Sequence, residues 1–315
     1  MGPRTDARTI AAGIGMASIF GFSFLFTKKA LAALSLLDLL AVRFTIAAGV
    51  MFLLAAIGLI RVDLSRRRWL RLLPLAAVQP VAYFFCETAG VKLTTASEAG
   101  VIIGSIPVVV AIMAAVFLRE RPAALQMLFI ISSSFGVALM VAGGGGLGRG
   151  HLGGLFLLLG AVLSAGFYSI LSRRLRGEFS PMEITLVMMG AGAVVFNTVA
   201  LAAHLAAGSS FPAAALVRPS VWMPLLYLGL LSSVAAFFLV NFMLSKLEAT
   251  RTVAYTNLTS LVSLMAGVLI LGERLHWHQW AGGVLILAGV WGTNRFARAQ
   301  AVLAQPLGAE AGVAE

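Results

Sequence analysis

The stretches Phe117-Leu118-Arg119-Glu120-Arg121 and Ile270-Leu271-Gly272-Glu273-Arg274 decide the fold of this chain. The Glu-Arg pair that they share is followed, at equal distances, by three further identities: Gln126, Gly136 and Val137 match Gln279, Gly289 and Val290. All of these identities lie at one offset, 153 residues, measured from Glu120 to Glu273. Agreement at a single offset indicates an internal duplication, and a duplication of this kind constrains the whole fold.

The beginning of each copy also matches. The residues Phe22, Lys28, Lys29 and Asp38 lie opposite Phe167, Arg173, Arg174 and Glu183, at an offset of 145 residues. Pro74 and Pro224 are predicted to begin the third and eighth apolar stretches. The change in offset fits a longer loop around Gly208. We therefore expect a first repeat over residues 1–147, a second over 148–298, and a disordered cytoplasmic tail over 299–315.

The composition predicts an all-α integral membrane protein. Of the 315 residues, 60% are hydrophobic and only 11% are charged, and the mean hydropathy is +0.98. A soluble domain of this length could not cover so much apolar surface, so much of it must face lipid. Backbone polar groups in lipid must be paired internally, so each span is predicted to be a helix. Ten apolar stretches are long enough to cross the bilayer: 9–27, 36–60, 70–91, 97–118, 124–143, 152–172, 182–206, 222–245, 250–271 and 278–296.

The distribution of basic residues predicts the orientation of these spans. When the N-terminus is placed in the cytoplasm, most of the 23 Lys and Arg residues fall in cytoplasmic segments, such as Arg66-Arg67-Arg68. This bias favours an even number of spans, with the N- and C-termini cytoplasmic, in a prokaryotic cell membrane. Each half holds five spans, so the second half must enter from the opposite side. The two halves are therefore predicted to be inverted repeats, an arrangement typical of secondary transporters that work by alternating access.

Several other classes of protein are disfavoured by what the sequence contains. The net charge of +11 does not indicate nucleic-acid binding, because the basic residues lie in short clusters between apolar stretches. The single cysteine, Cys86, rules out an intrachain disulfide and a multi-cysteine metal site. We find no zinc-protease, nucleophile-elbow or phosphate-loop motif, and no repeated charge ring or filter motif. An enzyme, a channel and a primary pump are therefore not expected, nor is a cofactor or a bound metal.

The sequence resembles the drug/metabolite transporter superfamily, in the branch with two EamA domains. The resemblance rests on the paired stretches around Glu120 and Glu273, and it covers about residues 9 to 296. Supporting features are Phe20-Gly21-Phe22-Ser23-Phe24, Arg43-Phe44 and Ile106-Pro107. The resemblance implies ten helices around a central cavity, with the fifth and tenth helices peripheral. It also implies transport of amino acids, other metabolites or drugs, commonly outward, without fixing one substrate.

Ionisable residues within membrane spans are the first candidates for a substrate site, because burying them in a bilayer is expensive. Arg43 lies in the second span and Glu87 in the third, and the predicted topology places them at similar depth. Arg43 is a candidate for binding a substrate carboxylate, and Glu87 for carrying a coupling proton. The alternative is a structural ion pair between neighbouring helices, and the sequence favours neither interpretation.

Polar and aromatic residues complete the list of candidates. Asn241, Tyr255 and Asn257 are able to hydrogen-bond a substrate, although bonding between helices is the more common role of such residues. Aromatic side chains suit organic substrates and cations, and the candidates of this kind are Phe22, Tyr83, Phe167 and Tyr168. Ordinary packing is again the more common role. Trp69, Trp222, Trp277 and Trp280 are expected to anchor span ends at the membrane interface.

The sequence therefore predicts a secondary transporter that exports amino acids or related small metabolites. Efflux of drugs or toxic cations is a close alternative within the same class. The expected partners are the small-molecule substrate and the lipid bilayer, with proton or ion coupling left open. The internal duplication makes a working monomer plausible.

Overall fold

The computed structural model describes residues 6–60, 62, 67–93, 102–119, 122–142, 152–213, 216, 218–262, 265 and 276–296. In this part of the chain the structure is helical, and the one β-bridge joins Arg176 to Phe179. The α-helices of the first half are α1 (Ala7–Leu31), α2 (Leu36–Ala56), α3 (Leu73–Ala76), α4 (Tyr83–Leu93), α6 (Ile106–Phe117) and α7 (Ala124–Ala142). Those of the second half are α8 (Leu152–Arg174), α9 (Pro181–Ala207), α10 (Pro219–Leu226), α11 (Ala236–Lys246), α12 (Ala249–Ala254) and α14 (Trp277–Arg295).

Six helical segments are long and apolar enough to cross a membrane: 7–31, 36–56, 69–90, 152–174, 181–207 and 219–246. Two shorter apolar helices cover 106–117 and 124–139. Each of the ten predicted spans contains helix in the described residues, but parts of the fourth and ninth fall outside them. The glycine run at 143–146, the Glu-Arg pairs at 120–121 and 273–274 and the tail also lie outside the described residues. The number ten therefore stays a prediction.

The third and eighth predicted spans are both interrupted by a π-helical segment. In the third, a 3₁₀ turn, η1 (Arg67–Leu72), and α3 lead into η2 (Ala77–Ala82) and then α4. In the eighth, α10 leads into η4 (Tyr227–Ala235) and then α11. The prediction that Pro224 begins the eighth span is wrong, because α10 begins five residues earlier, at Pro219. Pro74 does stand at the start of α3, after the 3₁₀ turn.

Matched caps explain the similarity at the start of the second span of each half. Ser35 caps α2 by accepting a hydrogen bond from the backbone N–H of Asp38, and its hydroxyl donates to the Asp38 carboxylate. Ser180 caps α9 in the same way with Glu183, whose carboxylate accepts from the backbone N–H of Ser180. The acidic side chains near these helix starts also oppose the positive end of each helix dipole. Asp38 and Glu183 thus recur because both helices need the same cap.

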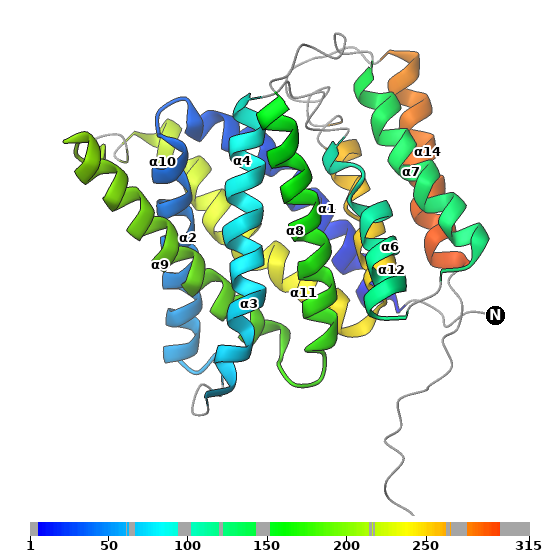
Figure 1. Cartoon of the computed structure of the whole chain (residues 1–315), viewed down its shortest axis with the longest axis horizontal. Coiled ribbons are helices and arrows are strands. Elements are labelled where there is room, and N and C mark those ends of the chain that lie inside the picture. Colours follow the sequence, from blue (N-terminus) through cyan, green and yellow to red (C-terminus); the bar gives the residue numbers. More distant parts are fainter. Residues whose placement is uncertain are drawn as a thin grey trace, which may run out of the picture.

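The recurring glycines mark the place where α7 and α14 pack together. A Cβ atom on Gly136 would lie 2.7 Å from the carbonyl oxygen of Gly282, and one on Gly289 would lie 2.3 Å from the Cβ of Ser133. Small residues allow such close approach between membrane helices. Figure 1 shows the pair at one edge of the bundle, with α9 at the opposite edge. This agrees with the expectation that the fifth and tenth spans are peripheral.

The other helices form the body of the bundle through contacts between the two halves. Helix α2 packs on α9, α4 packs on α8, and α1 packs on α11. Helix α6 contacts both α8 and α12. Large apolar side chains also cover the outside, including Phe135, Phe156, Val194 and Leu201, each more than half exposed. An apolar exterior on this scale is expected only where a protein faces lipid or a partner.

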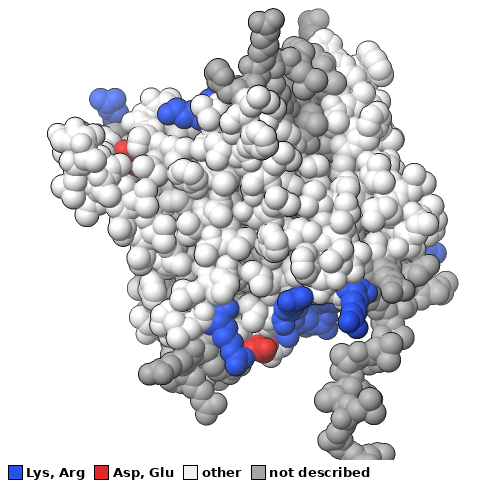
Figure 2. All heavy atoms as spheres, in the orientation of Figure 1, with Lys and Arg blue, Asp and Glu red and all other residues white. Residues whose placement is uncertain are grey.

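Charged side chains gather at the two ends of the bundle. Figure 2 shows Lys and Arg concentrated along its lower end, with a mostly white band above them. Exposed basic residues of the segments ending there include Arg71, Arg119, Arg174, Arg176 and Lys246. Partial burial, and to a smaller extent the neighbouring positive charge of Arg173, lower the pKa of Arg176 at this end.

Candidate functional site

Arg43 is buried in the middle of the bundle, about 10 Å along α2 from its first residue at the usual helical rise. Only 4% of its surface is exposed. Its Nε donates to Ser233 Oγ at 2.8 Å, and its Nη2 donates to Ser232 Oγ at 2.9 Å. Both hydroxyls belong to η4, so the guanidinium connects the second span of one half to the eighth span of the other. Gly229 of η4 allows this contact, because a Cβ there would meet Ile46 of α2 at 2.6 Å.

Aromatic rings cover the faces of this guanidinium. The Cζ atom of Arg43 lies 4.4 Å from the ring centroid of Phe84 and 5.7 Å from that of Phe44. Phe84 also packs edge-on against Phe237, which in turn contacts Phe20. These rings come from α1, α2, α4 and α11. A cation stacked on aromatic rings is stabilised without losing its charge or its hydrogen-bonding edges.

Glu87 and Tyr83 lie near Arg43 without neutralising it. Glu87 and Arg43 interact electrostatically, but the structure forms no ion pair between these two described residues. The direct ion pair between Arg43 and Glu87, one of the two interpretations that the sequence left open, is therefore not seen between these residues. Glu87 is half-buried, and its carboxylate has a long contact of 3.5 Å with the Thr88 hydroxyl. Tyr83 is half-buried and stacks edge-on against Phe84. Arg43, Tyr83 and Glu87 are thus brought together.

Asn241 and Tyr168 form a second buried cluster. The Asn241 side-chain oxygen accepts from Tyr168 Oη at 2.9 Å and from Ser172 Oγ at 3.1 Å. Its Nδ2 donates to Thr185 Oγ1 at 3.1 Å and makes a longer contact of 3.8 Å with Met188 Sδ. These bonds join α8, α9 and α11. The cluster uses both ends of the amide within the protein.

Asn257 and Tyr255 lie elsewhere, against other helices. Asn257 Nδ2 donates to Ser133 Oγ at 2.9 Å, which ties the ninth span to α7. Tyr255 is buried, and its ring lies against Gly13 of α1, where a Cβ would come within 2.4 Å of it. The two residues thus contact different helices, although they are only two positions apart in the sequence.

The two phenylalanines at matching positions in the repeats have different surroundings. Phe22 is half-buried in α1. Phe167 is 44% exposed on α8, and its ring contacts Phe117. The residues around Arg43 that the sequence did not single out are Phe84, Ser232 and Ser233. Serines and phenylalanines are common in membrane helices, so only their position opposite Arg43 distinguishes them.

A contact between a histidine and a buried aspartate closes the end of the bundle away from the basic cluster. His204 Nε2 lies 2.8 Å from Asp38 Oδ1, and His204 Nδ1 lies 2.9 Å from Ser209 Oγ. Asp38 is 2% exposed. The contacts fasten the end of α9, where Gly208 adopts a left-handed conformation, to the start of α2. These two residues are far apart in the chain, and the sequence analysis did not pair them.

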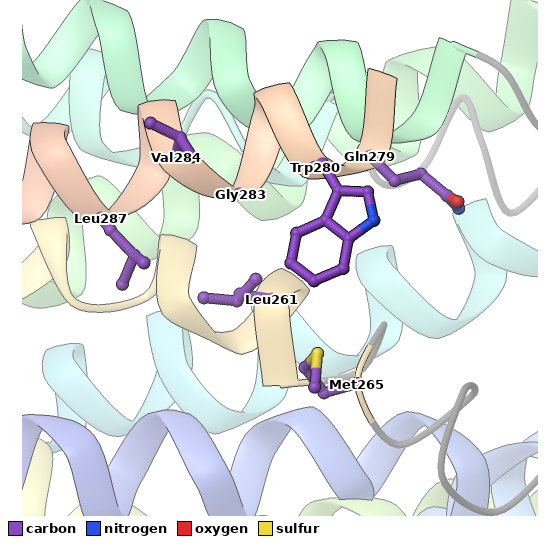
Figure 3. A pocket seen from close by; sticks show the side chains of 7 residues that line it. All are labelled: Leu261, Met265, Gln279, Trp280, Gly283, Val284 and Leu287. Carbon is purple, nitrogen blue, oxygen red and sulfur yellow. The ribbon is translucent and has the colours of Figure 1, made fainter. Parts of the chain in front are cut away.

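A small pocket lies between α14 and the ninth span. Its volume is about 110 Å³, and its lining is apolar except for Gln279. Figure 3 shows Trp280, Leu261 and Met265 around it. Pockets that bind organic ligands are usually several times larger and contain converging polar groups. This pocket is therefore a poorer candidate for a substrate site than the surroundings of Arg43.

Comparison with known proteins agrees with this architecture. The sequence matches the EamA-like transporter family over residues 7–142 and again over 152–295. It is 36% identical, over 278 residues, to the uncharacterized transporter YcxC of Bacillus subtilis. This match covers 88% of this chain and 89% of the relative. It is 28% identical, over 200 residues, to the probable terminal-alkyne amino-acid exporter of Streptantibioticus cattleyicolor, with 64% of each chain covered.

A solved structure shares the fold, with a TM-score of 0.74 at 19% identity, and the match covers 91% of this chain and 99% of that one. Each of the two matches to the family spans one of the halves that the internal duplication defines. Both matches include the helices that carry the buried polar clusters. The chain belongs to the EamA-like transporter family.

Proposed function

We propose that this protein is a secondary transporter that exports amino acids or related small metabolites by alternating access. Ten spans in two inverted five-helix halves, bounded near residues 147 and 298, would form the moving parts. The contacts between helices support this proposal. The third span of the first half packs on the first span of the second half, which is the sixth predicted span. In the same way, the first span of the first half packs on the third span of the second half, which is the eighth.

The observation that carries the proposal is the state of Arg43. It is a buried cation within a membrane span, held by neutral hydroxyls and aromatic rings, and no carboxylate of the described residues forms an ion pair with it. A buried charge is expensive unless it is paired. A substrate carboxylate would supply the missing counter-charge and form strong charge-assisted hydrogen bonds. Arg43 is therefore our candidate for binding the carboxylate.

Glu87 and Tyr83 are the next candidates because they lie beside Arg43. Glu87 would receive a substrate ammonium group or carry a coupling proton. A probable amino-acid exporter among the relatives supports a substrate with both groups. Asn241, Tyr168, Asn257, Tyr255, Phe22 and Phe167 remain candidates of lower rank, since the first three already bond within the protein.

Efflux of organic cations is the alternative, and Glu87 is the observation that favours it. Among the described residues this half-buried carboxylate has no ion-pair partner, and together with the rings of Tyr83 and Phe84 it would suit a cation. The buried positive charge of Arg43 opposes this use of the site, because it would repel a cationic drug. We therefore favour the carboxylate-bearing substrate.

Uptake into proteoliposomes tests the proposal directly. A panel of labelled amino acids and a panel of organic cations would be offered to wild type, Arg43→Ala and Glu87→Gln. Saturable uptake of an amino acid that is lost in Arg43→Ala is the expected result. Uptake of cations alone, lost in Glu87→Gln, would establish the alternative instead. Amino-acid uptake that is equal in all three proteins would remove Arg43 from the site.

We also propose that the basic end in Figure 2 faces the cytoplasm, with both chain termini on that side. The start of α1 and the end of α14 lie toward this end in Figure 1. Single cysteines placed at Ala7 and at Arg295, in a Cys86→Ser background, would test this orientation. Labelling by a membrane-impermeant maleimide only after the cells are opened is expected at both positions.

A further inference from the structure

The guanidinium of Arg43 has two edges, and the described residues form hydrogen bonds with only one of them. The Nε and Nη2 N–H groups on its side edge donate to Ser233 and Ser232. Among the described residues, no hydrogen bond of Nη1 completes the other edge. An arginine fork can bind a carboxylate through two parallel N–H groups on one edge while the second edge is held elsewhere. The serines therefore leave an edge with the geometry that a carboxylate needs.

The two serines are themselves well fixed. Both are fully buried, and they are consecutive residues of η4, the π-helical segment of the eighth span. Single π-helical turns are rare and are found preferentially at functional sites. On a regular α-helix, consecutive residues point in directions about 100° apart. Here the two hydroxyls nevertheless reach one guanidinium, at nearly equal distances.

We propose that Ser232 and Ser233 are positioning residues, which hold the side edge of Arg43 so that its free edge is fixed for the anionic group of the substrate. This inference rests on the proposed function. Without the serines, a long arginine side chain has several rotamers, and ordering it would reduce the affinity for the substrate. Because the serines belong to the second half and Arg43 to the first, the complete site requires both halves in contact.

The test compares a carboxylate with its neutral analogue. The double variant Ser232→Ala/Ser233→Ala would be reconstituted beside wild type, Arg43→Ala and the control Ser169→Ala. Ser169 is also buried, but its hydroxyl donates to Ala165 O within its own helix. The probes are the amino acid with the greatest wild-type uptake in the panel and the carboxamide of that same amino acid, added as a competitor.

The expected result is a rise of about tenfold in the KM for the amino acid in the double variant, the size expected for losing hydrogen bonds to a charged group. The inhibition constant of the carboxamide should change by less than about twofold, because a neutral amide gains little from an ordered guanidinium. The control should match wild type. Each single serine variant keeps one hydroxyl and should show a smaller rise, so the test does not depend on the double variant folding.

Other outcomes separate the two proposals. If Arg43→Ala loses the preference for the carboxylate but the serine variants keep it, the proposed function stands and the positioning role is wrong. If the serine variants weaken the amino acid and the carboxamide equally, the serines act only in packing and the inference fails. If wild type and Arg43→Ala treat the carboxylate alike, Arg43 does not bind it and the positioning role fails with that assignment. If wild type takes up none of the amino acids, the proposed function itself fails.

Discussion

Two buried polar clusters, one at Arg43 and one at Asn241, show how differently a membrane protein can use polar groups. At Asn241 the amide oxygen accepts from two hydroxyls and the amide nitrogen donates to a third. At Arg43 a full charge is held by two serines and a ring, and one edge of the guanidinium has no bond among the described residues. The first cluster is complete within the protein, and we propose that the substrate completes the second.

This difference separates structural polar groups from candidates for binding. A satisfied network contributes to packing between helices, at a modest free energy per bond. An incompletely paired charge costs stability, and it is retained only where it serves some other purpose. The two clusters also differ in where they connect the chain. Arg43 joins the two halves, whereas the residues bonded to Asn241 all belong to the second half.

The largest expected effect comes from Arg43→Met. Methionine is the residue at the matching position of the second repeat, Met188 of α9, at the offset of 145 residues. We expect uptake of a carboxylate substrate to fall by at least about a hundredfold, since removing one partner of a buried charge pair costs several kcal/mol. The free energy of unfolding should stay equal or rise, because an apolar side chain avoids burying a charge. Proteoliposome uptake and unfolding by SDS in mixed micelles measure the two quantities. A large loss of stability would instead make Arg43 structural.

The opposite pattern is expected for Asn241→Leu. This change leaves the hydroxyls of Tyr168, Ser172 and Thr185 without their shared partner, so the free energy of unfolding should fall by about 1–3 kcal/mol. The KM for the substrate should stay within about threefold of wild type, because the cluster already uses its bonds internally. SDS unfolding and uptake measure both. A selective loss of substrate affinity at unchanged stability would transfer the binding role to this cluster.

A smaller effect is expected where a polar group caps a helix. Asp38→Ala removes a buried carboxylate that bonds both Ser35 and His204, so it should lower the free energy of unfolding by about 1–2 kcal/mol. Glu183→Ala removes the matching exposed cap, and its cost should be about 0.5–1 kcal/mol. Unfolding of both variants in parallel checks the order. Equal costs would show that the contact with His204 adds nothing.

The smallest effect is expected at the exposed ion pair between Arg71 Nη1 and Glu178 Oε2, 3.1 Å apart at the basic end. Solvent screens such pairs, so Arg71→Ala should change the free energy of unfolding by less than about 1 kcal/mol. Uptake should not change. Unfolding at low and high salt provides the measurement. A larger, salt-sensitive loss would mean that this pair stabilises the contact between the halves more than its exposure suggests.

Much of the architecture was predictable because it follows from composition and repetition. Long apolar stretches without charge allow few structures other than helices in a bilayer, and matched residues at fixed offsets reveal the duplication. Gly136 and Gly289 were noticed only as matching positions, and the structure gives them a shared role in the close packing of α7 on α14. The start of the eighth span was misplaced at Pro224, because a proline inside a membrane helix looks like a boundary in the sequence.

The candidate site was predicted only in part. Arg43, Tyr83 and Glu87 were identified because charged and aromatic residues stand out in an apolar span, and the structure brings these three together. The serines of η4 were missed, because nothing in their local sequence distinguishes them from packing residues. The sequence left open whether Arg43 and Glu87 form a direct ion pair, and the described residues show none between them. Depth in a membrane can be estimated from topology, but the direction of a side chain around its helix cannot.

The sequence by itself determined that this chain is a helical membrane protein built from two related halves, because those properties depend on hydropathy and periodicity along the chain. It also singled out Arg43 as an ionisable residue within a span, and the structure buries it. Only the tertiary structure decided that Arg43 is held by hydroxyls from the other half while Asn241 is fully bonded within its own. The reason is physical: whether a buried polar group is satisfied depends on neighbours that are more than 50 residues away in the chain, such as Ser233 for Arg43 and Tyr168 for Asn241.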